Sequence, residues 1–188
     1  MENPSSKTAE KSARVFFALW PDDAPRAALA AWQPPLHELC GGRSMRASNL
    51  HATLIFLGDV VQHRLEALQL AAQEVAGRVA DGDGFQLNFD VAHYWGHNHI
   101  VYAAAHAVPP QLARLVAELE AGLRRHRFSF DHRPYKAHVT LLRHAKWSDA
   151  PLPQMHRVAW KVRDFALVQS QSDEGGANYQ VLARFPLR

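Results

Sequence analysis

The chain has 188 residues, of which 47% are hydrophobic and 21% charged, and a formal net charge of +3. This is the composition of a globular protein with an ordinary core, and no apolar run approaches the roughly 20 residues that span a bilayer. The charge is too low for the dense Lys/Arg stripe of a dedicated nucleic-acid binder, although it suits a small anionic substrate or an RNA end. The sequence therefore predicts no membrane association.

Residues 1–13 are polar and of mixed charge, without the apolar segment of a secretory signal. We expect a disordered tail there and a single domain over residues 14–188. The one cysteine, Cys40, cannot form an internal disulfide, which favours a reducing cytoplasm. Its position before a Gly-Gly turn favours packing at a helix end. Nothing in the sequence requires a protein partner, so we expect a cytoplasmic monomer.

Strand and helix patterns follow one another along the chain, punctuated by Pro and Gly clusters. In the first half they predict a buried strand at 13–20, helical residues 24–39 that "QPP" interrupts or kinks, a loop or edge at 41–48, a strand at 50–58 and a long helix at 61–80. In the second half they predict a hairpin of residues 85–95 and 99–105 around "GHN", a helix at 108–126, and strands at 136–145, 157–170 and 178–187.

This order contains a repeat of strand, helix and strand. His51 follows Val15 of the first strand by 36 residues, and His138 follows Val101 of a later strand by 37 residues. Internal repetition predicts two related lobes that face each other across a cleft. Paired strands separated by helices favour an α+β fold with mostly antiparallel sheets.

The repeat carries the same short motif twice, "HATL" and "HVTL". Of the three threonines in the chain, Thr53 and Thr140 each stand two residues after a histidine and one before a leucine. Side chains alternate across a strand, so His51 and Thr53 share one face, as do His138 and Thr140. If the lobes are related by a two-fold axis, two imidazoles and two hydroxyls meet in one cleft.

Alternation also places the other residues of these strands. Leu54 and Phe56 fall on the face opposite His51, where they are expected in the core. Arg143 falls on the face opposite His138, so it reaches the cleft only if the strand twists, bulges or ends there.

Two histidines and two hydroxyls suit in-line displacement at phosphorus. One neutral imidazole accepts a proton from water while a second, protonated imidazole donates one to the leaving oxygen. Hydroxyls and a cation stabilise the charge on the phosphoryl oxygens. The second histidine does what a Lewis acid would do, so we expect neither a metal nor another cofactor.

The paired motif, the opening "FFALWP" and the contexts "NLHxTLxFLG" and "PYxxHxTLxR" resemble the 2H phosphoesterase superfamily. The similarity is greatest to its LigT-like RNA 2′,3′-cyclic phosphodiesterases, also described as 2′-5′ RNA ligases, and covers residues 14–186. The resemblance implies a bilobal α+β fold and hydrolysis of RNA 2′,3′-cyclic phosphate ends to 2′-phosphates. Catalysis of this reaction in the reverse direction would account for the name 2′-5′ RNA ligase. Other cyclic phosphates or 2′-5′ linkages would suit the same cleft.

The resemblance also implies roles for individual residues. His51 would donate the proton to the leaving 3′ oxygen and His138 would accept one from water. The substrate-binding residues would be Thr53, Thr140 and Arg143. The family usually has proline before the second histidine, where this chain has Ala137. This departure reduces rigidity at the start of the strand and leaves the chemistry in place.

Two alternatives remain open. His93, His97 and His99 in "HYWGHNH" could form a metal site of a phosphohydrolase, although zinc needs three or four ligands in fixed geometry. The chain could instead be a non-catalytic module that binds RNA ends through aromatic and basic side chains. The candidate residues for such a module are Phe16, Phe17, Tyr94, Trp95, Arg43, Arg46, Lys136 and Arg143.

Overall fold

The computed structural model describes residues 10–187 except 81, 148 and 174–175. The predicted tail therefore lies mostly outside the described residues. Its last part is structured, because the first strand begins at Ser12 and the Gln62 amide donates to the Lys11 carbonyl at 2.9 Å. The tail prediction was thus too long at its C-terminal end.

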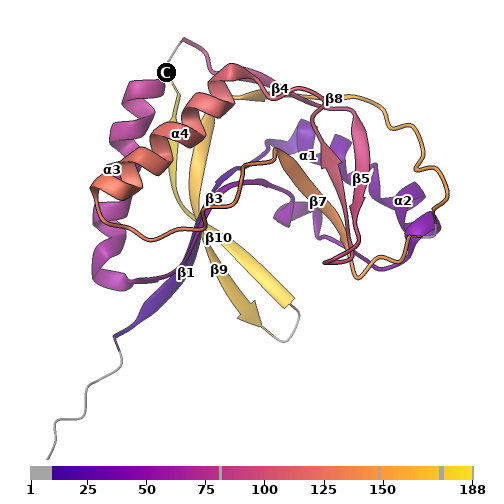
Figure 1. Ribbon diagram of the computed structural model, residues 1–188, viewed down its shortest axis with the longest axis horizontal. Coiled ribbons are helices and arrows are strands. Elements are labelled where there is room, and N and C mark those ends of the chain that lie inside the picture. Colours follow the sequence, from indigo (N-terminus) through magenta and orange to yellow (C-terminus); the bar gives the residue numbers. More distant parts are fainter. Residues whose placement is uncertain (1–9, 81, 148, 174–175, 188) are drawn as a thin grey trace, which may run out of the picture.

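The first lobe is a four-stranded antiparallel sheet in the order β10-β9-β1-β3. Two helices pack against each other and cover this sheet on one side (Figure 1). The elements are β1 (Ser12–Leu19), β3 (Ala52–Val61), β9 (Asp164–Asp173), β10 (Gly176–Pro186), α3 (Leu65–Val79) and α4 (Pro110–Arg125), with a 3-10 turn, η2 (Gln62–Arg64), before α3.

The second lobe is a four-stranded antiparallel sheet in the order β2-β7-β6-β5. A separate two-stranded ribbon, β4 with β8, runs beside both lobes at the top of Figure 1. The ribbon consists of β4 (Phe85–Phe89) and β8 (Val158–Val162). The remaining elements are α1 (Asp23–Ala30), α2 (Gln33–Cys40), β2 (Arg43–Ser44), η1 (Ala47–Asn49), β5 (Val91–Trp95), β6 (Ile100–Ala104) and β7 (His138–Arg143).

Each lobe is contacted by a helix that lies in the connection between two strands of the other lobe. The segment between β1 and β3 carries α1 and α2, and α2 contacts β7 of the second lobe. The segment between β6 and β7 carries α4, which packs on α3 and contacts β3 of the first lobe (Figure 1). The two lobes are therefore interlocked, and the predicted bilobal α+β fold is confirmed.

Two of the predicted strands were too long. The predicted strand 85–95 breaks at Asp90 into β4 and β5, and the predicted strand 157–170 breaks at Arg163 into β8 and β9. In each case the chain moves from one sheet to another. At Asp90 the alternating pattern of Phe85, Leu87 and Phe89 continues to Val91, so the sequence carries no signal of the break, whereas at Arg163 two consecutive polar residues interrupt the pattern. The interruption of the first helix by "QPP" is confirmed, because α1 ends at Ala30 and α2 begins at Gln33.

Strand β1 is buried on both of its faces, as its continuous apolar sequence predicts. Val15, Phe17 and Leu19 belong to the main core beneath the helices. Phe16, Ala18 and Trp20 belong to a second cluster on the opposite face, together with Ala166 and Val168 of β9.

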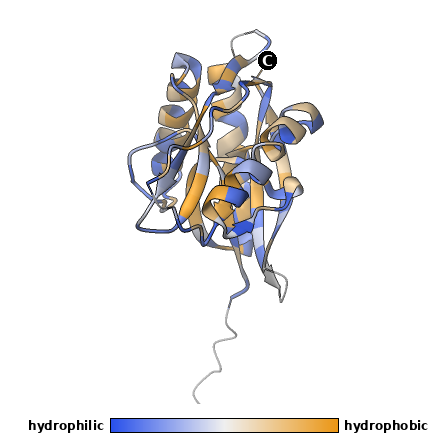
Figure 2. Cartoon of the chain, turned by 90° about the vertical axis from the view of Figure 1, so that its right-hand side faces the viewer, coloured by the Kyte–Doolittle hydropathy of each residue, from blue (hydrophilic) through white to orange (hydrophobic). Residues whose placement is uncertain are grey.

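Figure 2 shows the hydrophobic residues gathered on the strands, with hydrophilic residues in the surrounding loops. None of the helices in the described part of the chain is long and apolar enough to cross a membrane.

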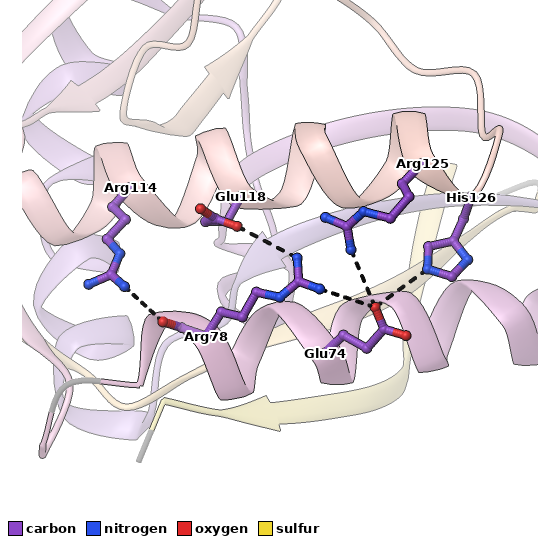
Figure 3. Close-up of polar contacts among 6 residues, drawn as sticks. All are labelled: Glu74, Arg78, Arg114, Glu118, Arg125 and His126. Carbon is purple, nitrogen blue, oxygen red and sulfur yellow. Dashed lines mark hydrogen bonds and ion pairs between the residues drawn. The ribbon is translucent and has the colours of Figure 1, made fainter.

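Helices α3 and α4 are held together by buried aliphatic side chains and by a polar rim. Within the interface Gly122 lies against Val75 at a separation that leaves little room for a Cβ. On the rim, nitrogen atoms of Arg78, Arg125 and His126 lie within ion-pair distance of the Glu74 carboxylate, at 3.5–3.7 Å (Figure 3). These groups are about half exposed, so each pair contributes at most about 1 kcal/mol and packing dominates.

Candidate active site

The two motif strands, β3 and β7, contact each other where the two sheets meet. His51 immediately precedes β3 and His138 begins β7. A chamber of about 260 Å³ opens beside His51. Its lining residues are Arg14, Phe16, Met45, Asn49, His51, Thr53, Phe56, Thr140, Arg143, Ser170 and Tyr179.

His138 lines an adjoining and larger hollow, of about 590 Å³. Thr53 and Phe56 line both spaces, so the chamber beside His51 and the hollow beside His138 adjoin. His138 also contributes to the lowered pKa of His51, which places the two imidazoles within electrostatic range. The structure thus brings together the five residues that the sequence singled out.

The two imidazoles are oriented in the same way. Nδ1–H of His51 donates to the Asn49 carbonyl at 2.7 Å, and Nδ1–H of His138 donates to the Lys136 carbonyl at 2.8 Å. A carbonyl only accepts, so each bond places the proton on Nδ1 and leaves a lone pair on Nε2. In both motifs the accepting carbonyl lies two residues before the histidine, which gives each lobe the same tautomer.

Both motif strands bulge directly after the threonine. In β3, Thr53 pairs with Ala18 and Ile55 with Phe17, which leaves Leu54 as the extra residue. In β7, Thr140 pairs with Tyr102 and Leu142 with Val101, which leaves Leu141 as the extra residue. An extra residue reverses the alternation beyond it.

The bulges bring Phe56 and Arg143 to the cleft. Each stands five residues after its histidine, and both line the chamber beside His51. The prediction that Phe56 faces the core was wrong, because it assumed strict alternation through Leu54. Arg143 reaches the cleft by the bulge that its predicted role required.

The bulge in β7 is held by a second layer of hydrogen bonds. The Leu141 carbonyl accepts from the Met45 amide at 2.8 Å and from the side-chain amide of Gln33 at 3.0 Å. The same Gln33 nitrogen donates to the Met45 carbonyl at 2.8 Å. Gln33 is buried, so α2 fixes both the bulge and the segment that carries β2.

A glycine makes this junction possible. Gly42 has φ +85°, and a Cβ there would lie 2.6 Å from the Arg143 carbonyl oxygen and 2.9 Å from the Ala145 nitrogen. Gly42→Ala is expected to lower the free energy of unfolding by about 2–4 kcal/mol, because backbone strain and a backbone clash add. Urea denaturation measures this loss, and turnover should fall with it because Arg143 is displaced.

Gly82→Ala is the matched control for Gly42→Ala. Gly82 has φ +76°, and nothing lies within 4 Å of an added Cβ. It therefore carries the conformational strain without the clash, and its expected loss is about 1–2 kcal/mol. Equal losses in the two variants would show that the close approach to Arg143 is unimportant.

Aromatic rings enclose His51. Trp20 stacks on its imidazole at 5.3 Å and 13°, Phe16 lies at 5.0 Å, and the Tyr179 ring meets it edge-on at 5.1 Å. The resulting burial is the main reason that the pKa of His51 is lowered from 6.5 to about 4. The nearby His138 and Arg143 act in the same direction, and the hydrogen bond to the backbone opposes them. His51 is therefore neutral near pH 7 in the free protein.

His138 has a similar but more open environment. Its ring lies 4.8 Å from Trp95 and 5.6 Å from Tyr102, in edge-on contacts. Burial lowers the pKa of His138 as well, against the hydrogen bond to Lys136. Both imidazoles thus begin neutral, with Nε2 as an acceptor.

Comparison with known proteins shows the family of this chain. The family described as the 2′-5′ RNA ligase superfamily matches residues 21–174. The chain belongs to the 2′-5′ RNA ligase superfamily. The RNA 2′,3′-cyclic phosphodiesterase of Escherichia coli (strain K12) is 31% identical over 174 residues, covering 93% of this chain and 96% of that protein. The protein of the same name from Thermus thermophilus is 28% identical over 187 residues, covering 93% and 90%.

Solved structures show the same superfamily fold. The crystal structure of E. coli LigT in its apo form matches with a TM-score of 0.78 and 30% identity, over 95% of this chain and 98% of that one. The crystal structure of TT0787 from T. thermophilus matches with a TM-score of 0.72 and 28% identity, over 93% and 98%.

Sequence reasoning missed part of this superfamily site. It gives Trp20, Asn49 and Tyr179 no functional role, yet all three touch His51 or supply its carbonyl partner. Asn49 also ties the site to β10, because its side-chain amide donates to the Ala177 carbonyl at 3.0 Å. The even spacing of Phe16, Ala18 and Trp20 could have placed Trp20 on the cleft face; nothing in the sequence pointed to Tyr179.

The alternative metal site is not formed. His93 packs beside Tyr102, while His99 Nδ1 lies 3.0 Å from the Tyr94 hydroxyl, which donates to a backbone carbonyl. Among the described residues no three His, Cys, Asp or Glu side chains converge as metal ligands. Cys40 is buried, and burial raises the pKa of its thiol, as expected for a packing residue.

Proposed function

We propose that this chain hydrolyses RNA 2′,3′-cyclic phosphate ends to 2′-phosphomonoesters by paired histidine acid–base catalysis. The observation that carries the proposal is the pair of imidazoles with matching tautomers on the two sides of one cleft, each beside a threonine. Two relatives that align with nearly the whole chain are named RNA 2′,3′-cyclic phosphodiesterases.

In this reaction His138 Nε2 accepts a proton from water as the water oxygen attacks phosphorus. The bond between phosphorus and the 3′ oxygen breaks, and His51 Nε2–H supplies the proton for that oxygen. The 2′ ester bond remains, so the product is a 2′-phosphate. Thr53, Thr140 and Arg143 hold the phosphoryl oxygens and stabilise the charge that develops on them.

The neutral state of His51 in the free protein constrains this mechanism. An acid must carry a proton, and burial with nearby positive charge opposes that proton. A bound cyclic phosphate brings a negative charge next to the imidazole and raises its pKa. Substrate binding thus favours protonation of His51, so His51 can donate a proton only when the site is occupied.

Structures of a relative are consistent with an anion-binding cleft. E. coli LigT has been crystallised with 3′-AMP and with phosphate, at 30% and 28% identity to this chain. Reversible 2′-5′ ligation is part of the proposal, because the same two histidines can run the displacement backwards. We further propose that the chain works in the cytoplasm, supported by its single cysteine, which cannot form an internal disulfide, and that it works as a monomer without an obligate protein partner.

The proposal is tested by incubating the protein with adenosine 2′,3′-cyclic phosphate in excess EDTA. We expect turnover to adenosine 2′-phosphate, resolved from the 3′ isomer by chromatography, because the acid is a histidine rather than a bound metal. Loss of activity in EDTA would contradict the two-histidine mechanism. A 3′-phosphate product would reverse the assignment of the leaving oxygen.

A further inference from the structure

The chamber beside His51 extends beyond the residues that carry the acid–base chemistry. Phe16 of β1 lies 5.0 Å from the His51 imidazole, and Phe56 of β3 is directly opposite Phe16 in the antiparallel register. The Arg14 guanidinium in turn lies 4.9 Å from the centre of the Phe56 ring. All four side chains line the chamber, so a pair of aromatic rings separates Arg14 from His51.

Three neighbouring strands build the end of the chamber that contains Arg14. Arg14 of β1 pairs with Ser170 of β9, and Ser170 pairs with Tyr179 of β10. Directly opposite residues share a face of the sheet, and Phe16 shares this face because it follows Arg14 by two residues. The Tyr179 ring meets the Phe16 ring edge-on at 5.4 Å. This end of the chamber therefore combines apolar ring surfaces with the polar groups of Arg14 and Ser170.

The contact with Phe56 positions the Arg14 guanidinium and leaves its N–H groups available. A cation–π contact uses the face of the aromatic ring and no hydrogen-bond acceptor. Within the part of the chain that the structure describes, the Arg14 side chain forms no ion pair and no hydrogen bond. Asp59 is opposite Arg14 in the pairing of β1 with β3, but it does not line the chamber. Arg14 can therefore donate to a bound ligand.

The proposed reaction decides which part of a substrate reaches Arg14. His51 supplies the proton for the leaving 3′ oxygen, so the terminal ribose lies on the His51 side of phosphorus. In-line attack places water on the other side, beside His138. The base is attached to the 1′ carbon, away from the phosphoryl group, so it extends over the aromatic side chains of the chamber. Unpaired bases stack on such rings, and the outer edge of the base then meets Arg14 and Ser170.

The hydrogen-bonding groups at this end of the chamber favour one kind of base edge. A guanidinium only donates, and among the described residues that line the chamber there is no carboxylate to accept from a base. Guanine presents two adjacent acceptors, O6 and N7, which one arginine can bind with two hydrogen bonds. Adenine has an amino group in place of O6, and that donor would face the donors of Arg14.

We infer that Arg14, with Ser170 beside it, binds the base edge of the terminal nucleotide, so that the protein prefers a guanosine end to an adenosine end. Arg14 is then a specificity-determining residue that lies outside both histidine–threonine motifs. This inference rests on the proposed function and deepens it, because it identifies which 2′,3′-cyclic phosphates are the better substrates.

The test compares the 2′,3′-cyclic phosphates of guanosine, inosine and adenosine with the wild-type protein. Inosine keeps O6 and N7 of guanine and lacks its 2-amino group, so it isolates the edge assigned to Arg14. We expect kcat/KM for guanosine and inosine to exceed that for adenosine by about tenfold, at the lower end of the effect of one bidentate contact. A value for inosine no higher than that for adenosine would overturn the inference, whereas a protein that hydrolyses none of the three would overturn the proposed function.

Arg14→Gln identifies the residue. A glutamine amide both donates and accepts, which suits N6 and N7 of adenine, so the ratio of kcat/KM for guanosine to that for adenosine should fall by about tenfold. A purely structural effect would lower both values and leave their ratio unchanged. Arg163→Gln is the matched control, because it removes the same charge from a site paired with Asp83, and the ratio should not change. An unchanged ratio in Arg14→Gln would overturn the assignment of Arg14.

Discussion

Replacing His138 with asparagine is expected to lower kcat on a nucleoside 2′,3′-cyclic phosphate by about 10²–10⁴-fold, the usual contribution of a general base. The Asn side-chain amide can still donate to the Lys136 carbonyl, as Nδ1–H does now. It has no counterpart of Nε2, so the proton acceptor alone is removed. His51→Asn tests the acid in the same way, because its amide can donate to the Asn49 carbonyl.

Binding measurements separate catalysis from recognition in these variants. Both should still bind adenosine 2′-phosphate, because the threonines and Arg143 remain. The double variant should be little slower than the slower single variant, since an acid and a base that act in one step are not additive. Single variants that keep near-normal turnover would contradict paired histidine catalysis, whereas a wild-type protein that binds RNA ends without turnover would leave the binding-only alternative in place.

Acidification from about pH 7.5 to about pH 4.5 is expected to destabilise the protein through His51, by on the order of 3 kcal/mol. The pKa of His51 is lowered from 6.5 in the unfolded chain to about 4 in the folded one. The unfolded state therefore binds more protons in that window. The stabilisation is fully present above pH 6.5 and is lost as the pH falls toward 4.

Urea denaturation across this range measures the effect, with His51→Gln as the comparison that removes the titrating group. The variant should show a flatter dependence of the unfolding free energy on pH than the wild type. Binding of inorganic phosphate near pH 5.5 should be accompanied by proton uptake at His51, because the bound anion raises the pKa of the imidazole. Calorimetry in buffers of different ionisation enthalpy detects this proton, and identical pH slopes for the two proteins would contradict the buried neutral state.

The site residues could be found from the sequence because the motif is local and repeated. His51 and Thr53 need only strand alternation to share a face, and His138 with Thr140 repeats the pattern in the second lobe. The match of spacing from Val15 and Val101 then predicted two lobes and one cleft. Antiparallel neighbours in the structure, β1 with β3 and β6 with β7, agree with that spacing.

The sequence by itself thus determined the pair of motifs, the bilobal α+β fold and the convergence of the two histidines and two threonines on the central cleft. Only the tertiary structure decided which way Phe56 and Arg143 point, because each bulge depends on the partner strand that leaves Leu54 or Leu141 unpaired. It also decided the lowered pKa of His51. Trp20 and Tyr179 come from opposite ends of the chain, and pairing of β1, β9 and β10 brings their rings to the imidazole.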